Sequence, residues 1–226
     1  MNEPGQGLKT WPLKLFAVVV VAVVAVLAAL VLFARVSKEK AKAQRIRCTG
    51  NLKQIGLWFR IFEADHNGKF PMHFSTNQGG TLEFTGAGQV FRHFQAISNE
   101  LTTPLVLTCP ADTRKPVARF IPGQMPTTNF SALTDANISY FVSLDTMAET
   151  PQALLSGDRN LMADGVPIQS GLFVLRTNSA VAWSSAMHKR AGNVGLGDAT
   201  VQQFTTQRLV EQVRYSGTPT NRLLFP

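Results

Sequence analysis

One uninterrupted apolar run near the amino terminus constrains this chain more than any other feature. From Leu15 to Ala34, twenty consecutive residues carry no charge and no strongly polar side chain. A helix of that length spans about 30 Å, the thickness of the hydrocarbon core of a bilayer. A buried core helix rarely needs so long a run without a polar stripe. The sequence therefore predicts a transmembrane helix over residues 15–34, with the lipid bilayer as a partner.

A cleaved secretory signal is the main alternative for this run. Its apolar region would be shorter, and a small-x-small cleavage site would follow closely. The candidate site, Ala41-Lys42-Ala43, lies behind four charged residues between positions 35 and 40, which suits cleavage poorly. We therefore expect an uncleaved anchor, preceded by a cytoplasmic amino-terminal segment over residues 1–14.

The basicity of the chain is confined to its amino-terminal part. Residues 1–53 hold nine Lys and Arg against two Glu, a net charge of +7. Residues 54–226 hold thirteen basic against twelve acidic residues, a net of +1, which completes the overall +8. A nucleic-acid-binding protein would need its basic residues on the folded body. We therefore expect no nucleic acid partner.

The same charges bear on membrane topology. Lys9 and Lys14 precede the apolar run, whereas six basic residues follow it between positions 35 and 47. The positive-inside rule would place the large carboxyl-terminal part in the cytoplasm. Cys48 and Cys109 give a weak indication of the opposite, because disulfides form in oxidising compartments. Composition alone leaves the topology open.

Helical periodicity continues beyond the apolar run. Apolar residues recur at helical spacing at Leu52, Ile55, Phe59 and Phe62. This spacing predicts an amphipathic stem helix over residues 35–66. Asn67-Gly68 is expected to cap it in the left-handed conformation, and Pro71 prevents its continuation. A globular head is expected over residues 67–226.

The head is predicted to be mainly β-structure. A short helix is expected at Val90–Leu101 and a later one from Thr205 or Thr206 through Tyr215. Short β-prone runs separated by Gly, Asn, Asp and Pro predict strands. These runs are Leu105–Thr108, Ile138–Leu144, Gly171–Arg176, Ala180–Trp183, Asn193–Leu196 and Thr200–Phe204. A long amino-terminal helix followed by a mainly antiparallel sheet gives an α+β fold class.

Several short motifs occur in a fixed order over residues 48–201. They are CTGNLKQIGL at 48–57, DHNGKFP at 65–71, LTCPAD at 107–112, SYF at 139–141, GDR at 157–159, GNV at 192–194, and His188 with Asp198. In this order they resemble bacterial type II secretion pseudopilin-like proteins. More specifically, they are similar to the group that carries a prepilin-type cleavage/methylation segment and a carboxyl-terminal H-x9-DG motif.

The resemblance implies a pilin-like fold, in which a long helix, half in the membrane, packs on a small antiparallel head. It implies a single-pass protein of the inner (cytoplasmic) membrane with its head in the periplasm, against the positive-inside count. The implied role is a structural or accessory subunit of a type II secretion or type IV pilus-like system. Other pilin-like subunits or the secretion machinery would be its partners.

Two positions depart from the pattern of that family. Prepilins carry a Glu five residues after the cleavage point, but the nearest frame, at residues 7–12, has Pro12 there. No acidic residue occurs between Glu3 and Glu39. This departure keeps open a membrane-tethered binding module that has a periplasmic head and does not assemble. Ala199 stands where the family has the Gly of Asp-Gly, and Ala resists the positive φ that Gly allows.

His188 and Asp198 are the pair most able to carry chemistry. Ten residues apart on two strands joined by a loop, they could ligate a metal or form the acid–base pair of a hydrolase. The structural alternative is that His188 caps the loop and Asp198 forms an Asx turn. Because no third ligand has a recognisable spacing, we expect a structural motif. No enzymatic activity, catalytic residue, cofactor or metal is expected.

The two cysteines are expected to form a disulfide. Cys48 lies on the predicted stem, Cys109 ends a predicted strand that could pack on it, and both fall in segments that resemble the family. Two buried free thiols are the alternative, favoured by a cytoplasmic head. Among the other polar residues, Asp158 and Arg159 could form an exposed ion pair or part of a site, and a structural ion pair is the commoner case in an antiparallel head. His93 is expected to be partly buried.

Overall fold

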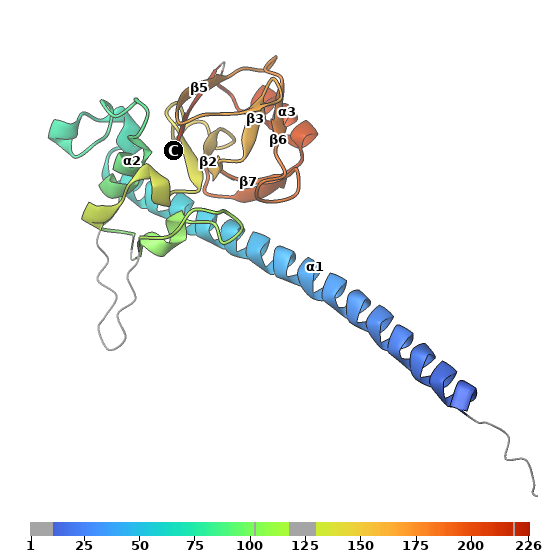
Figure 1. Cartoon of the computed structure of the whole chain (residues 1–226). Coiled ribbons are helices and arrows are strands. Elements are labelled where there is room, and N and C mark those ends of the chain that lie inside the picture. The colour runs from blue at the N-terminus through green and yellow to red at the C-terminus, as the bar shows by residue number, and fades with distance from the viewer. Residues whose placement is uncertain (1–10, 102, 118–129, 219) are drawn as a thin grey trace, which may run out of the picture. The chain divides into compact units, whose positions relative to one another are not determined.

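The computed structural model describes residues 11–101, 103–117, 130–218 and 220–226 (Figure 1). The chain divides into two compact units, Met1–Ala43 and Gln44–Pro226. The cytoplasmic segment predicted over residues 1–14 and the frame at residues 7–12 lie largely outside the described residues.

The first unit contains the amino-terminal part of helix α1 (Trp11–Asp65). Pro12 falls in the first turn of α1, where a missing backbone N–H leaves no hydrogen bond broken. All residues from 15 to 40 are exposed. Among the described residues, α1 is the one helix long and apolar enough to cross a membrane, as the apolar run predicted.

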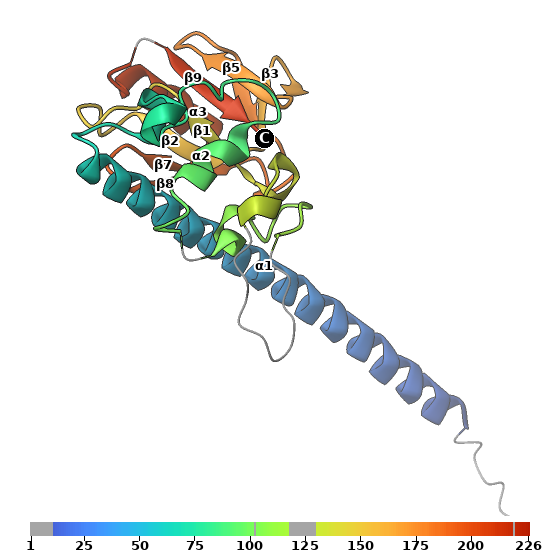
Figure 2. The same cartoon turned by 90° about the vertical axis from the view of Figure 1, so that its left-hand side faces the viewer.

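The second unit begins within α1. The predicted apolar stripe is buried there, with exposed fractions of 0% for Leu52, Ile55 and Phe59 and 5% for Phe62. The helix ends at Asp65, and Asn67 and Gly68 follow with φ angles of 54° and 79°. The left-handed cap predicted from Asn-Gly is therefore confirmed. Figure 1 shows this part of α1 beside strand β7 (Gly192–Leu196), and Figure 2 shows it beside β7 and β8 (Val201–Phe204).

A six-stranded antiparallel sheet forms the centre of the head, in the order β5-β9-β1-β2-β7-β8. Its other strands are β1 (Tyr140–Ser143), β2 (Leu154–Asp158), β5 (Gly171–Leu175) and β9 (Asn221–Phe225). A smaller sheet contains β3 (Leu161–Ala163), β4 (Val166–Pro167) and β6 (Val181–Trp183), in the order β4-β3-β6. The long helix and this mainly antiparallel head give the α+β fold class that the sequence predicted.

The central sheet is covered on both faces. Tyr140, Val142, Leu155 and Leu224 join the core beneath α1, whereas Phe141, Leu154 and Leu223 join a second core. This alternation follows from the period of two along a strand. The second core also contains Leu209 and Val213 of helix α3 (Thr206–Tyr215), which Thr205 caps as predicted by accepting a hydrogen bond from the backbone N of Arg208 at 3.3 Å.

Two predicted elements differ in the structure. Helix α2 (Val90–Ala96) ends before the predicted Leu101, and Ile97 is its carboxyl-terminal cap. Ser98 and Asn99, which follow, are poor helix formers. The strand predicted at Leu105–Thr108 is instead the 3-10 helix η3 (Pro104–Leu107). Pro104 starts that helix and Thr103 caps it, which is the usual role of both residue types.

The remaining 3-10 helices are short and lie in the connections. They are η1 (Pro71–His73), η2 (Thr76–Gln78), η4 (Phe130–Ala132) and η5 (Asp135–Asn137). Four strands, β2, β3, β4 and β9, were not predicted from the sequence. Because β9 pairs between β5 and β1, it is an internal strand of the sheet, next to the edge strand β5.

His93 on α2 is completely buried, which corrects the prediction of partial burial. Its Nε2 faces the backbone carbonyl of Phe84 at 2.8 Å and must donate, so Nδ1 accepts from the hydroxyl of Thr81 at 2.7 Å. Burial lowers the pKa of His93 from 6.5 to about 4. Since the unfolded chain binds this proton more readily, protonation of His93 favours unfolding.

The contribution of His93 to stability is therefore expected to fall by up to about 3 kcal/mol as the pH drops from about 6.5 to about 4. It is fully present above that window, because the imidazole is then neutral in both states. Urea unfolding of the wild type and of His93→Gln, followed across this pH range, measures the effect. Gln cannot gain a proton, and the other titrating groups are common to both proteins. An identical pH dependence of the two proteins would contradict the prediction.

Candidate functional site

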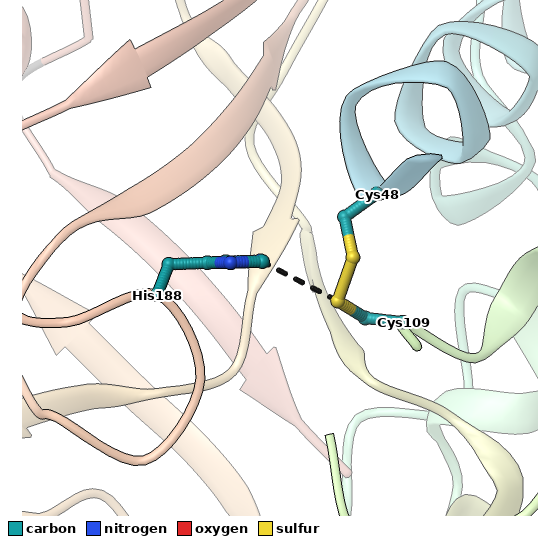
Figure 3. Close-up of side chains that lie close together, drawn as sticks. All are labelled: Cys48, Cys109 and His188. Carbon is teal, nitrogen blue, oxygen red and sulfur yellow. Dashed lines mark hydrogen bonds between the residues drawn. A yellow bond between two sulfur atoms is a disulfide. The ribbon is translucent and has the colours of Figure 1, made fainter. Parts of the chain in front are cut away.

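The candidate site is a buried polar cluster between the stem part of α1 and the central sheet. Cys48 comes from α1, and Cys109 lies just after η3. Asp158 ends β2, and His188 lies in the connection from β6 to β7. None of these side chains is more than 5% exposed. Figure 3 shows the His188 ring directed at the sulfur of Cys109, beside its bond to Cys48.

The predicted disulfide between Cys48 and Cys109 is present. The two Cα atoms lie 5.1 Å apart, and the bond closes a loop of 61 residues. Both cysteines are 0% exposed. The bridge fastens the stem to the segment after η3, a connection that the chain would otherwise make only through noncovalent packing.

Asp158 is an inward-facing carboxyl at the end of β2 and is 0% exposed. Its Oδ2 accepts hydrogen bonds from the backbone N and from Nδ2 of Asn193, at 2.6 and 2.8 Å. Its Oδ1 has no hydrogen-bond partner among the described residues. Burial raises the pKa of Asp158 to about 7, although the bonds from Asn193 oppose that rise. The carboxyl group can therefore gain or lose a proton near neutral pH.

His188 is held against this carboxyl by a constrained loop. Its Nε2 lies 3.4 Å from Oδ2 of Asp158 and 3.4 Å from Sγ of Cys109. Burial, aided by the charge of Arg45, lowers the pKa of His188 to about 4. The imidazole is therefore neutral at pH 7, so its contact with Asp158 is not an ion pair. The next two residues, Lys189 and Arg190, both have positive φ, at 54° and 63°, a conformation that costs non-glycine residues energy.

The predicted exposed pair between Asp158 and Arg159 is wrong. Successive residues of a strand point to opposite sides, so Asp158 faces inward while Arg159 reaches a different carboxylate. The Arg159 guanidinium donates two hydrogen bonds to Asp112, both at 2.8 Å. Although burial opposes the shift, this pairing keeps the pKa of Asp112 below its usual value. The pair lies next to the candidate site and brings it no net charge.

His188 and Asp198 are not brought together. They lie at opposite ends of β7, and Asp198 is exposed. Its Oδ1 accepts hydrogen bonds from the backbone N and the hydroxyl of Thr200, at 2.9 and 2.6 Å, which is the Asx turn that the sequence predicted. Ala199 adopts a φ of 64°, a left-handed conformation that glycine adopts more readily than alanine.

The sequence did not identify Asp158 as the neighbour of His188. The signal that could have found it is the run Leu154-Leu155-Ser156-Gly157-Asp158, in which every residue is buried. A strand covered on both faces does not alternate between apolar and polar residues. The run was not recognised as a strand, so the inward direction of its last side chain could not be inferred.

The arrangement combines redox chemistry with metal-ligating chemistry. It contains a cleavable S–S bond, a neutral imidazole and a carboxyl group that titrates near neutral pH, all shielded from solvent. No protein-family model, curated protein or solved structure matches this chain.

Proposed function

We propose that this protein is a pseudopilin-like structural or accessory subunit of a type II secretion or type IV pilus-like system. A single helix anchors it in the cytoplasmic membrane, and its head lies in the periplasm. The observation that carries the proposal is the continuity of α1 (Trp11–Asp65). One helix supplies both an exposed apolar segment and, from Cys48 onward, a stripe buried in an antiparallel head.

The exposed apolar segment needs a cover other than water. Its side chains are mostly Val, Leu and Ala, and large ones such as Phe33 and Leu15 are 74% and 67% exposed. Lipid and the matching segments of neighbouring subunits both provide such a cover. The buried disulfide supports a head in an oxidising compartment. The motif order over residues 48–201 supports the pilin-like assignment and the absence of an enzymatic role.

A non-assembling, membrane-tethered binding module with a periplasmic head is the second candidate. The absence of any acidic residue between Glu3 and Glu39 favours it. Prepilins place a carboxylate in this region, where it can pair with the amino group of a neighbouring subunit at low dielectric. Both candidates share the same topology and differ in whether the anchoring helices pack together.

Topology is tested first, with Thr177→Cys in cells whose outer membrane is permeabilised. Thr177 is exposed on the connection between β5 and β6. The native cysteines are paired and buried, so they are unsuitable as reporters. A membrane-impermeant maleimide should label this variant before the inner membrane is lysed. Labelling only after lysis would place the head in the cytoplasm and overturn the proposal.

Assembly is tested by placing single cysteines at successive positions over residues 20–26 and oxidising intact membranes. Specific packing of anchoring helices should give cross-linked dimers at every third or fourth position, since one helix face would meet its neighbour. Thr177→Cys serves as the control outside the span. If the chain remains a monomer with the cysteine at every one of these positions, the assembling subunit is rejected in favour of the non-assembling tethered module.

A further inference from the structure

Four metal-ligating side chains meet inside the head, each from a different segment of the chain. The ligand atoms of Cys48, Cys109 and His188 all lie within 4.8 Å of one another (Figure 3). Asp158 adds a carboxylate oxygen 3.4 Å from Nε2 of His188. Once the disulfide is opened, these residues offer two sulfurs, one imidazole nitrogen and one carboxylate oxygen. That is a four-ligand set of the kind zinc accepts.

We propose that the reduced chain binds one Zn²⁺ through Cys48, Cys109, His188 and Asp158. The disulfide and the zinc dithiolate are then two alternative states of the same site. The inference does not depend on the proposed function, because it concerns only the interior of the head.

Two of the ligand spacings, both measured from His188, are close to those of a tetrahedral zinc centre. With Zn–N and Zn–O bonds of about 2.1 Å and Zn–S bonds of about 2.3 Å, tetrahedral angles separate N from O by roughly 3.4 Å and N from S by roughly 3.6 Å. Both corresponding distances from His188 Nε2, to Asp158 Oδ2 and to Cys109 Sγ, are 3.4 Å. Formation of the centre requires the two sulfurs to separate to roughly 3.8 Å in the same geometry. It also requires the Asp158 carboxylate to move toward at least one of the cysteine sulfurs, because Asp158 is not among the three residues whose ligand atoms all lie within 4.8 Å of one another.

Some polar atoms of the site lack partners, although the Asp158 oxygen nearest His188, Oδ2, already accepts two hydrogen bonds from Asn193. A distance of 3.4 Å is long for a hydrogen bond from His188 to a carboxylate. Within the described residues, Oδ1 of Asp158 and Nε of Arg45 are buried without partners. Bound Zn²⁺ with two thiolates and one carboxylate carries a charge of −1, which the cationic Arg45 nearby would balance.

One dithiol reductant supplies the electrons and protons needed to convert the disulfide state into the zinc-binding state. The reductant gives two electrons and two protons to the Cys48–Cys109 bond, which becomes two thiols, while the reductant becomes a disulfide. Zn²⁺ then binds both sulfurs and displaces the two thiol protons to solvent. In the reverse direction a disulfide oxidant takes two electrons from the two thiolates and two protons from solvent. The oxidant becomes a dithiol, the Cys48–Cys109 bond forms again, and the ion is released.

A surface hollow borders Cys109. This residue lines a surface hollow of about 410 Å³, together with Asn51 and Arg47 of α1 and Thr108. The hollow brings solvent near Cys109, but both cysteines are 0% exposed, so a reductant or an ion reaches the sulfurs only when the surrounding residues move.

The test uses the full chain in detergent micelles, without a histidine tag, and Co²⁺ as a spectroscopic substitute for Zn²⁺. After reduction with a phosphine, one Co²⁺ per chain should give thiolate charge-transfer bands and the strong visible bands of tetrahedral cobalt. Zn²⁺ should abolish both sets of bands. The oxidised chain should show neither. An octahedral spectrum, or no binding by the reduced chain, would overturn the proposal.

Variants distinguish a defined four-ligand zinc site from zinc binding by the two cysteine thiols alone. His188→Ala should weaken the affinity of the reduced chain for Zn²⁺ at least about tenfold, and Asp158→Asn should weaken it less. His73→Ala, which removes a histidine outside the cluster, should leave the affinity unchanged. Equal affinities for His188→Ala and His73→Ala would refute the site.

A thermal measurement covers the case in which reduction or substitution unfolds the head. Zn²⁺ should then raise the melting temperature of the reduced wild-type chain in proportion to the logarithm of its concentration, because binding stabilises only the folded state. The rise should be much smaller for reduced His188→Ala. The absence of any rise in the reduced wild type would also reject zinc binding.

Discussion

Replacing Cys48 and Cys109 together by alanine is expected to lower the free energy of unfolding by about 4 kcal/mol. The disulfide closes a loop of 61 residues, and its loss returns that conformational freedom to the unfolded chain. Loss of two fully buried sulfur atoms adds to the effect. Urea unfolding of the full chain in detergent micelles measures the change by tryptophan fluorescence, since Trp58 and Trp183 are buried in the head.

The control for this prediction is reduction of the wild type in the presence of a chelator, which keeps any metal from replacing the bridge. Reduced wild type and the double variant should unfold at similar urea concentrations, and reductant should have no effect on the variant. If the oxidised wild type and the variant are equally stable, the bridge makes no contribution, and its role as the fastening between stem and head would be rejected.

The sequence predicted elements whose signal is local. The stem was found because Leu52, Ile55 and Phe59 repeat at helical spacing, and the end of the helix because Asn67-Gly68 favours left-handed backbone. The helix α3 was found because a capping Thr205 precedes an amphipathic run. Each of these features depends on residues within a few positions of one another, so the chain carries the signal without knowledge of its tertiary contacts.

The missed strands lack such a local signal. In β2 every residue is buried, because one face packs beneath α1 and the other against the second core. The alternation that marks a half-exposed strand is then absent. The strand β9 was missed at the very end of the chain, where it inserts between β5 and β1. Its position depends on pairing with segments far away in the sequence.

Only part of the candidate site was predicted, because the site also depends on contacts between residues far apart in the sequence. The pairing of Cys48 with Cys109 could be inferred because the chain has two cysteines. Cys48 was expected on the stem helix, and Cys109 on a segment that packs against it. Spacing along the sequence suggested Asp198 as the partner of His188, but β7 places those two residues at opposite ends. The true neighbour, Asp158, comes from the adjacent strand β2, whose register with β7 no local pattern reveals.

Gly192, the first residue of the GNV motif, lies directly against a buried tryptophan ring inside the head. A Cβ atom on Gly192 would lie closer than 3.0 Å to three ring atoms of Trp183, which is itself only 1% exposed. The indole ring therefore occupies the space that a side chain at position 192 would need. Gly192 also begins β7, directly after the loop that holds His188, so a displaced strand would disturb the candidate site as well.

Gly192→Val is expected to lower the free energy of unfolding by at least about 3 kcal/mol, because the ring and the new side chain cannot share the space. Gly50→Val adds the same atoms to α1, where nothing lies within 4 Å of the new Cβ, and should change stability by less than about 1 kcal/mol. Urea unfolding of both variants measures the difference. Trp183→Leu should relieve the clash, so the Gly192→Val substitution should cost much less in that background. Equal stabilities of the two valine variants, or an undiminished cost in the Trp183→Leu background, would show that the indole does not exclude a side chain at position 192.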